Sequence, residues 1–184
     1  MDKVYQGITP KLGDWIAQQH MFFVATAPLS ADGFVNCSPK GLDTFRVLGS
    51  REIAYLDLTG SGVETIAHLR ENRRIVFMFC AFDGPPKIVR LHGEGEVVTP
   101  QHSDYPLLLE HFQDYPGARA IIRARITRIS DSCGFSVPLY DYVGQRDTLV
   151  RFAEKKGEAG LAEYRRANNA ASLDGLAGLD VPEK

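Results

Sequence analysis

Residues 54–82 join a strand, a glycine turn, a helix and a second strand with almost no chain between them. The segment AYLDL has the character of a buried strand, TGSG ends it, VETIAHLREN is helical by pattern, and RIVFMFCAF is strongly apolar. A strand that turns at glycines into a helix presents unpaired backbone N–H groups at the start of that helix. The chain must therefore fold so that a sheet carries a short helix between two of its strands.

The turn at residues 59–62 has two interpretations. Ser61 and Glu64 have the spacing of a capping box, in which the serine hydroxyl accepts from the Glu64 amide and no ligand is needed. Alternatively, the N–H groups at the helix start bind an anion, and a phosphate-bearing cofactor is then the leading candidate. The residues of the turn alone leave both interpretations open.

Polar residues on two other segments supply partners for such an anion. In FVNCSPKG, Asn36, Ser38 and Lys40 alternate onto one face of a β segment, which therefore ends in a cation. In KIVRLHGEGEVV, Arg90 lies on the polar face of a half-exposed strand. Lys40 and Arg90 are the candidate charge partners if the fold brings them to the turn.

The chain as a whole has the pattern of a mainly β (α+β) protein. Strands are expected near residues 21–27, 34–38, 44–48, 52–58, 74–82, 87–98 and 119–130, and helices at 10–19, 62–71 and 148–169. Six or seven largely antiparallel strands with a short crossover helix and a C-terminal helix suit a small split β-barrel. We expect residues 1–184 to form a single domain, with a helical C-terminal extension at about 145–170 and a loose tail at 170–184.

The order of these motifs resembles the pyridoxamine 5'-phosphate oxidase-related FMN-binding split-barrel family. The motifs are SPKG, a strand, TGSG before a helix ending in REN, an apolar strand and RLHGEGEVV, and the likeness covers about residues 20–130. The resemblance implies an FMN phosphate near the strand-to-helix turn, a flavin ring or ribityl chain near Thr59, and a homodimer. The cofactor ligands it implies are Ser38, Lys40, Thr59, Ser61, Gly62, Thr65 and Arg90.

The chain departs from the family pattern at the start of the helix. Many members have an Arg or Lys pair there that holds the phosphate, whereas this chain has Gly62-Val63-Glu64, which supplies no cation and adds an acid. The cations that remain for the phosphate charge are Lys40, Arg90, Arg46 and Arg73.

The run Ile75–Phe82 is apolar at every position instead of at alternate ones. A strand with one wet face would alternate, so both faces of this strand are expected to be buried. One face fills the barrel, and a second copy of the chain is the simplest cover for the other, because two-fold dimers are the commonest oligomers. The alternative cover is the C-terminal helix of the same chain.

Composition excludes several classes of function. With 21 basic and 23 acidic residues the formal charge is −2, which provides no electrostatic footprint for nucleic acid or an anionic membrane. The N-terminal residues lack the apolar core of a secretory signal, and no run approaches 18 apolar residues, so a cytoplasmic protein is expected.

Other reactive residues show no pattern of a site. Cys37, Cys80 and Cys133 are far apart without a CxxC spacing, which favours reduced thiols over disulfides or zinc. The five histidines lack ligand spacing, and neither a G-x-S-x-G elbow nor a P-loop occurs, so metal-site and hydrolase interpretations have little support.

Residues 131–142 contain glycine, proline and several aromatic residues, which predict an ordered loop after the last strand. Phe135, Tyr140 and Tyr142 either cover a pocket and select the substrate or pack the C-terminal helix onto the barrel.

The sequence therefore predicts a homodimeric FMN protein that acts as a flavin-dependent oxidoreductase on an unidentified small molecule. The flavin would carry the electrons, so no catalytic side chain is required. Two alternatives remain, a non-catalytic protein that holds flavin or haem and a cofactor-free structural dimer of the same fold.

Overall fold

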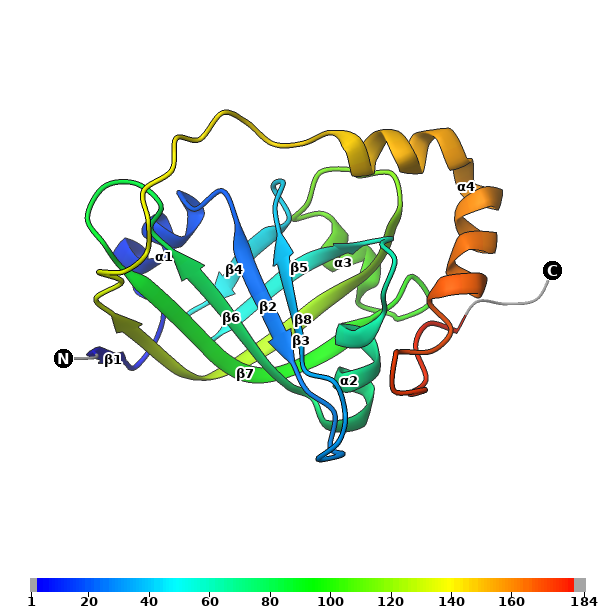
Figure 1. Ribbon diagram of the computed structural model, residues 1–184, viewed down its shortest axis with the longest axis horizontal. Helices are drawn as coiled ribbons and strands as arrows, with labels where there is room; N and C mark the ends of the chain where they lie inside the picture. Colours follow the sequence, from blue (N-terminus) through cyan, green and yellow to red (C-terminus); the bar gives the residue numbers. More distant parts are fainter. Residues whose placement is uncertain (1–2, 181–184) are drawn as a thin grey trace.

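One curved antiparallel sheet forms the body of the protein in the computed structural model, which describes residues 3–180 (Figure 1). Its strands are β1 (Lys3–Tyr5), β2 (Phe22–Thr26), β3 (Asn36–Lys40), β4 (Phe45–Gly49), β5 (Glu52–Leu58), β6 (Arg74–Cys80), β7 (Ile88–Val98) and β8 (Ala118–Ser132). They follow the order β3-β2-β6-β7-β8-β5-β4, with β1 also paired to β8, and every pairing is antiparallel. The expected mainly β split-barrel fold is confirmed.

In the described part of the chain, four helices flank the sheet: α1 (Pro10–Ala17), α2 (Glu64–Asn72), α3 (Tyr105–Leu109) and α4 (Thr148–Asn168). Helix α1 begins where Thr9 Oγ1 accepts from the Leu12 amide, 3.3 Å away, with Pro10 in the first turn. Helix α4 bends sharply at Gly157 (Figure 1), whose φ of 61° and ψ of 176° lie outside helical values. Among the described residues, none of the helices is long and apolar enough to cross a membrane.

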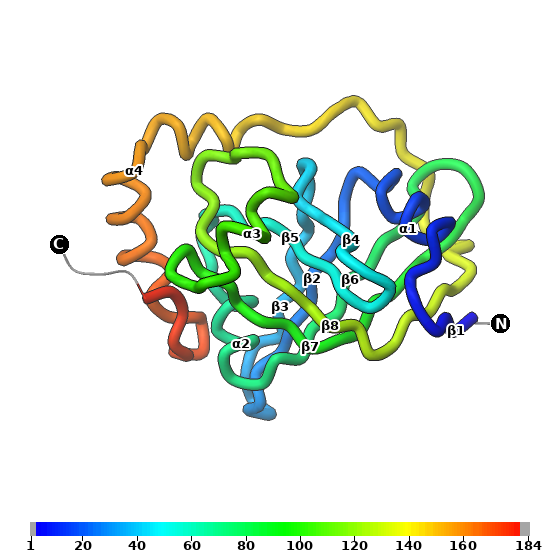
Figure 2. The backbone as a smooth tube through the Cα atoms, turned by 180° about the vertical axis from the view of Figure 1, so that it is seen from behind, coloured from blue at the N-terminus to red at the C-terminus, as the bar shows by residue number. Residues whose placement is uncertain are grey.

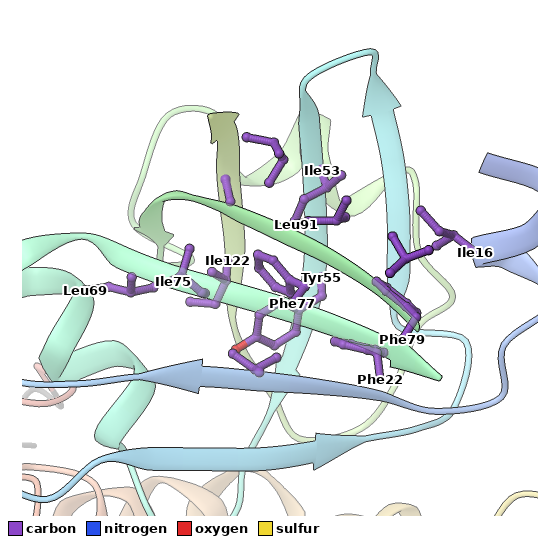
Figure 3. Packing of buried hydrophobic residues seen from close by; sticks show 14 of the residues in the cluster. Ile16, Phe22, Ile53, Tyr55, Leu69, Ile75, Phe77, Phe79, Leu91 and Ile122 are labelled. Carbon is purple, nitrogen blue, oxygen red and sulfur yellow. The ribbon is translucent and has the colours of Figure 1, made fainter. Parts of the chain in front are cut away.

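Aromatic side chains, among them Phe22, Tyr55, Phe77 and Phe79, fill the interior of the barrel (Figure 3). Phe45 of β4 meets Phe79 of β6 and Phe22 of β2 edge to face, with ring centroids 5.0 and 5.1 Å apart. Tyr55 and Phe77 are fully buried beside them. The same core continues to both ends of the barrel through isoleucine and leucine side chains of α1 and α2.

Strand β6 is buried on one face and half-buried on the other. Ile75, Phe77 and Phe79 belong to the core, whereas Val76 and Met78 on the opposite face stay partly exposed in the single chain. Helix α4 does not provide the alternative cover, because its buried residues Ala153 and Leu161 lie next to Gly117 instead. The apolar run is thus explained on its inner face only.

The segment after α4, which the structure describes as far as Asp180, folds back beside α2 (Figure 2). Leu179 joins the buried core, Asp174 accepts from the Phe34 amide at 3.2 Å, and Arg70 pairs with Asp180 at 3.0 Å. The expectation of a loose tail at 170–184 is therefore wrong for residues 170–180, because this segment buries an apolar side chain and pairs its charges. Residues 181–184 lie outside the described residues.

Candidate functional site

A cavity of about 1330 Å³ lies between β3, the turn before α2 and residues 140–146. Ligand pockets usually measure about 300–1,000 Å³, so this cavity is large enough for a dinucleotide-sized ligand or for two smaller molecules. Six of the seven candidate ligands line it: Ser38, Lys40, Thr59, Ser61, Gly62 and Thr65.

Arg90, the seventh candidate, does not line the cavity. Its Nη1 donates to Ser132 Oγ at 2.9 Å, across the pair formed by β7 and β8. Arg46 is likewise elsewhere, bonded to Asp43, and Arg73 lines a separate pocket with Arg51. The expectation that Arg90 approaches the turn is therefore wrong within the single chain, because alternation along β7 turns this residue away from the cavity.

A buried carboxylate forms ion pairs with two cations that line the cavity. Asp57, only 1% exposed, accepts from Lys40 Nζ at 3.0 Å and from Arg119 Nε at 2.7 Å. Burial alone would raise the pKa of Asp57, but the charges of Arg119 and Lys40 outweigh it and hold the pKa below its usual value. Asp57 therefore stays ionised, and one of the two positive charges beside it remains unbalanced.

The turn before α2 is built differently from a capping box. The helix begins at Glu64 with Val63 as its N-cap residue, and no side chain caps it. Val63 is buried in the core and occupies the N-cap position, two residues after Ser61, so the serine hydroxyl does not cap the helix. The capping-box interpretation is wrong.

The backbone amides at this turn are available to a ligand. Within residues 3–180, the N–H groups of residues 61–65 donate no hydrogen bond. The Glu64 carboxylate folds back over the turn, so closely that a Cβ added at Gly62 would clash with Glu64 Oε2. Glu64 Oε1 accepts from the Leu173 amide at 3.4 Å. The turn therefore offers unpaired donors with one acidic neighbour.

Asn169 and Arg119 hold the carbonyl groups of the same turn by hydrogen bonds. Asn169, which ends α4 and is fully buried, donates from Nδ2 to Gly60 O at 3.1 Å and contacts Gly62 O at 3.5 Å. Arg119 Nη1 donates to Gly62 O and to Asn169 Oδ1, both at 2.9 Å. The C-terminal segment thus fixes the orientation of the turn.

Thr59 lines the cavity, but its hydroxyl is already engaged. It donates to Gly117 O at 2.8 Å and accepts from Arg165 Nε of α4 at 2.8 Å. Thr59 therefore contributes its position and its backbone to the wall instead of an open hydroxyl.

A line of polar side chains runs along β3 into the site. Ser38 Oγ donates to Asn36 Oδ1 at 2.9 Å, and Asn36 Nδ2 donates to Thr65 Oγ1 at 3.1 Å. The alternation expected for this β segment places Asn36, Ser38 and Lys40 on the cavity side.

Residues 133–147 run as an extended strap from β8 over the barrel to α4 (Figure 1). Tyr142 stacks on His20 with ring centroids 3.5 Å apart, and the Tyr140 amide donates to Phe82 O at 2.8 Å. Gln145 bridges His20 O and the Leu42 amide at 2.9 and 3.0 Å. The two tyrosines line the cavity, as the first interpretation of this loop expected, whereas Phe135 is exposed away from it.

Sequence reasoning missed three residues that shape the site. Two of them could have been found in the sequence. Asp57 is an acid within the apolar strand AYLDL, which indicates a buried ion pair, and Arg119 lies on a strand with several arginines that could pair with it. Asn169 left no such signal, because its partners are carbonyl groups more than a hundred residues away. No cluster of three metal-ligating side chains occurs among the described residues.

A family model and a related protein each match more than half of this chain. The family model described as pyridoxamine 5'-phosphate oxidase matches residues 8–133. A pyridoxamine 5'-phosphate oxidase family protein of Aspergillus flavus, ustO, is 41% identical over 195 residues, which cover 95% of this chain and 77% of that protein.

Solved structures share the fold at low identity. HupZ of Group A Streptococcus has a TM-score of 0.54 at 20% identity, over 73% of this chain and 99% of that one. A protein of Lactobacillus delbrueckii assigned as a pyridoxamine 5'-phosphate oxidase has a TM-score of 0.52 at 17% identity, over 69% and 98%.

Proposed function

Because the chain belongs to the pyridoxamine 5'-phosphate oxidase family, we propose that it binds FMN in the cavity beside α2 and serves as a flavin-dependent oxidoreductase. The observation that carries this proposal is the convergence of Ser38, Lys40, Ser61 and Thr65 on unpaired amides at a helix N-terminus. Hydroxyl groups, one cation and backbone N–H groups are the donors that a phosphate monoester requires.

The residues present fit the cofactor. Lys40 supplies charge, Ser61 and Thr65 supply hydroxyl donors, and the turn supplies N–H groups, so the phosphate lies at the start of α2. Leu56, Leu58 and the strap line an apolar part of the same wall and would contact the isoalloxazine ring. When bound, FMN supplies the electron-accepting chemistry, while these residues orient it and limit the access of water.

The test of flavin binding is a titration of the purified protein with FMN, followed by flavin fluorescence and absorption. The wild-type protein is expected to bind one FMN per chain. Lys40→Ala is expected to weaken binding about 10-fold, since it removes a charge-assisted hydrogen bond. The matched control is Lys11→Ala, an exposed lysine of α1 outside the cavity, which should leave the affinity unchanged. A wild-type protein that quenches no FMN fluorescence refutes the proposal.

The redox role is tested separately from binding. The bound flavin is mixed anaerobically with NADH or NADPH, and bleaching followed by reoxidation with an acceptor is the expected result. If the protein binds one FMN per chain but neither a reduced nicotinamide nor an acceptor changes the redox state of the flavin, the protein holds flavin without catalysing a redox reaction.

We also propose that the protein is a homodimer, with the outer face of β2 and β6 at the interface. Phe23 and Ala25 lie directly opposite Met78 and Val76 in the ladder, and all four side chains are half-exposed in the single chain. Light scattering after gel filtration should give twice the mass of one chain. Met78→Asp should give the monomer, and Leu107→Asp, on an exposed part of α3, should not. A monomeric wild-type protein contradicts this proposal.

A further inference from the structure

Arg119 lines the cavity and has one guanidinium nitrogen that donates no hydrogen bond to the described part of the chain. The residue is only 6% exposed and lines the cavity, and its Nε and Nη1 bond Asp57, Gly62 O and Asn169 Oδ1. Its Nη2 donates no hydrogen bond within residues 3–180. Nη2 is not among the buried side-chain atoms that lack a partner, so it is accessible at the cavity wall and can donate to a ligand there.

Asn169 also fixes the direction of the turn amides. Its Nδ2 draws the carbonyl oxygen of Gly60 toward the C-terminal segment. In a trans peptide the C=O and the following N–H point in opposite directions, and no cis peptide occurs in the described chain. The N–H of Ser61 therefore points away from Asn169. The N–H of Val63 does the same, because Gly62 O bonds Arg119 and approaches Asn169.

Two cations line the cavity near the turn. Lys40 and Arg119 share the single carboxylate of Asp57, so one of their positive charges is not balanced by that carboxylate. The start of α2 carries no cation of its own, because its first residue is Glu64. The charge for an anion at the turn must therefore come from Lys40 and Arg119, which both line the cavity.

We propose that Arg119, held in place by Asn169, is a ligand of the cofactor phosphate, so that the C-terminal segment forms part of the cofactor site. This inference rests on the proposed function. Arg119 binds the phosphate through Nη2, and Asn169 is a positioning residue that fixes both the guanidinium and the turn amides. Asn169 lies outside residues 8–133, the part of the chain that the family model matches.

The experiment compares FMN with riboflavin, which has the same ring and ribityl chain but no phosphate. Dissociation constants for both are measured on the full chain for the wild type, Arg119→Lys, Asn169→Ala and the control Asn168→Ala. Arg119→Lys keeps a cation beside Asp57 but removes the fork of donors. Asn168 is exposed, and among residues 3–180 its side chain bonds Tyr164 O alone, so its variant controls for helix perturbation.

The expected result is a loss of preference for FMN over riboflavin. Arg119→Lys and Asn169→Ala should each reduce the FMN-to-riboflavin affinity ratio about 10-fold or more, while riboflavin affinity changes less than about threefold. Asn168→Ala should leave the ratio unchanged. An unchanged ratio in both variants, or an equal loss of both affinities, overturns the inference while the flavin proposal stands.

A second readout separates failure of the inference from failure of the proposed function. Inorganic phosphate should raise the unfolding temperature of the wild type, because a ligand that binds only the folded state stabilises it. It should do so less in Asn169→Ala. If the wild type binds neither flavin but phosphate stabilises it and not the variant, the flavin proposal falls and the anion site stands. If neither flavin nor phosphate acts on the wild type, both fall.

Discussion

Asp57→Asn is expected to destabilise the protein strongly although it changes no shape. The substitution leaves Arg119, with a side chain only 5% exposed, without its counter-charge, and it turns an amide N–H toward one of the two cations. Removing one partner of a buried ion pair costs about 3–5 kcal/mol. Lys40, a quarter exposed, adds less, because water already screens it. For a chain of this size, about 2–4 °C is lost per kcal/mol, so the unfolding temperature should fall by about 10 °C.

The measurement is urea unfolding of cofactor-free protein, followed by circular dichroism at neutral and acidic pH. Because the folded-state pKa of Asp57 lies below its ordinary value of 3.8, its stabilisation is complete above pH 3.8 and is lost as the pH falls through the folded-state pKa. The gap in unfolding free energy between the two proteins should therefore shrink in acid.

Asp14→Asn, at an exposed position of α1, serves as the control and should change the unfolding free energy by less than about 0.5 kcal/mol. A loss below about 1 kcal/mol for Asp57→Asn at neutral pH, or a gap that does not shrink in acid, would refute the assignment of Asp57 as a buried anion between two cations.

Three further substitutions probe the core, the docking of α4 and the turn. Phe77→Ala, at a fully buried ring, should cost about 3–5 kcal/mol in urea unfolding, and Phe135→Ala, at an exposed ring, less than about 0.5 kcal/mol. Gly117→Ala should cost about 2 kcal/mol, because φ is 84° and the new Cβ would lie 2.9 Å from Ala153 Cβ. Adding Ala153→Gly should recover only the contact part of that loss, and full recovery would show that backbone strain is absent. Glu64→Gln should tighten FMN binding about threefold or more in a fluorescence titration, since it removes a negative charge beside the turn, and weaker binding would contradict the phosphate position.

Much of the sheet could be predicted because its signals are local. Strand β5 spans residues 52–58 as expected, and β7 and β8 differ from the expectation by at most two residues at each end. Their alternation and glycine boundaries are properties of neighbouring residues. Strand β1 and helix α3 were not predicted, because three and five residues are too few to show a period.

The site was predictable where its residues belong to one local motif. Lys40, Ser61 and Thr65 line the cavity because alternation on β3 and the position of the turn place them there. The expected position of Arg90 beside the turn was wrong for the single chain. The polar face of β7 is identifiable in the sequence, but the direction in which that face points is not. The expected ligand roles stay predictions for all seven candidate residues.

The sequence by itself determined the longer strands, the turn before α2, the crossover helix and the family, all of which depend on residues close in the chain. Only the tertiary structure decided that Arg119 and Asn169 meet beneath Gly62, and that residues 170–180 pack beside α2 instead of forming a tail. The physical reason is the range of the interactions. Backbone preference and hydrophobic period act over a few residues, whereas a buried ion pair or a carbonyl bound by a distant amide exists only after the sheet has closed.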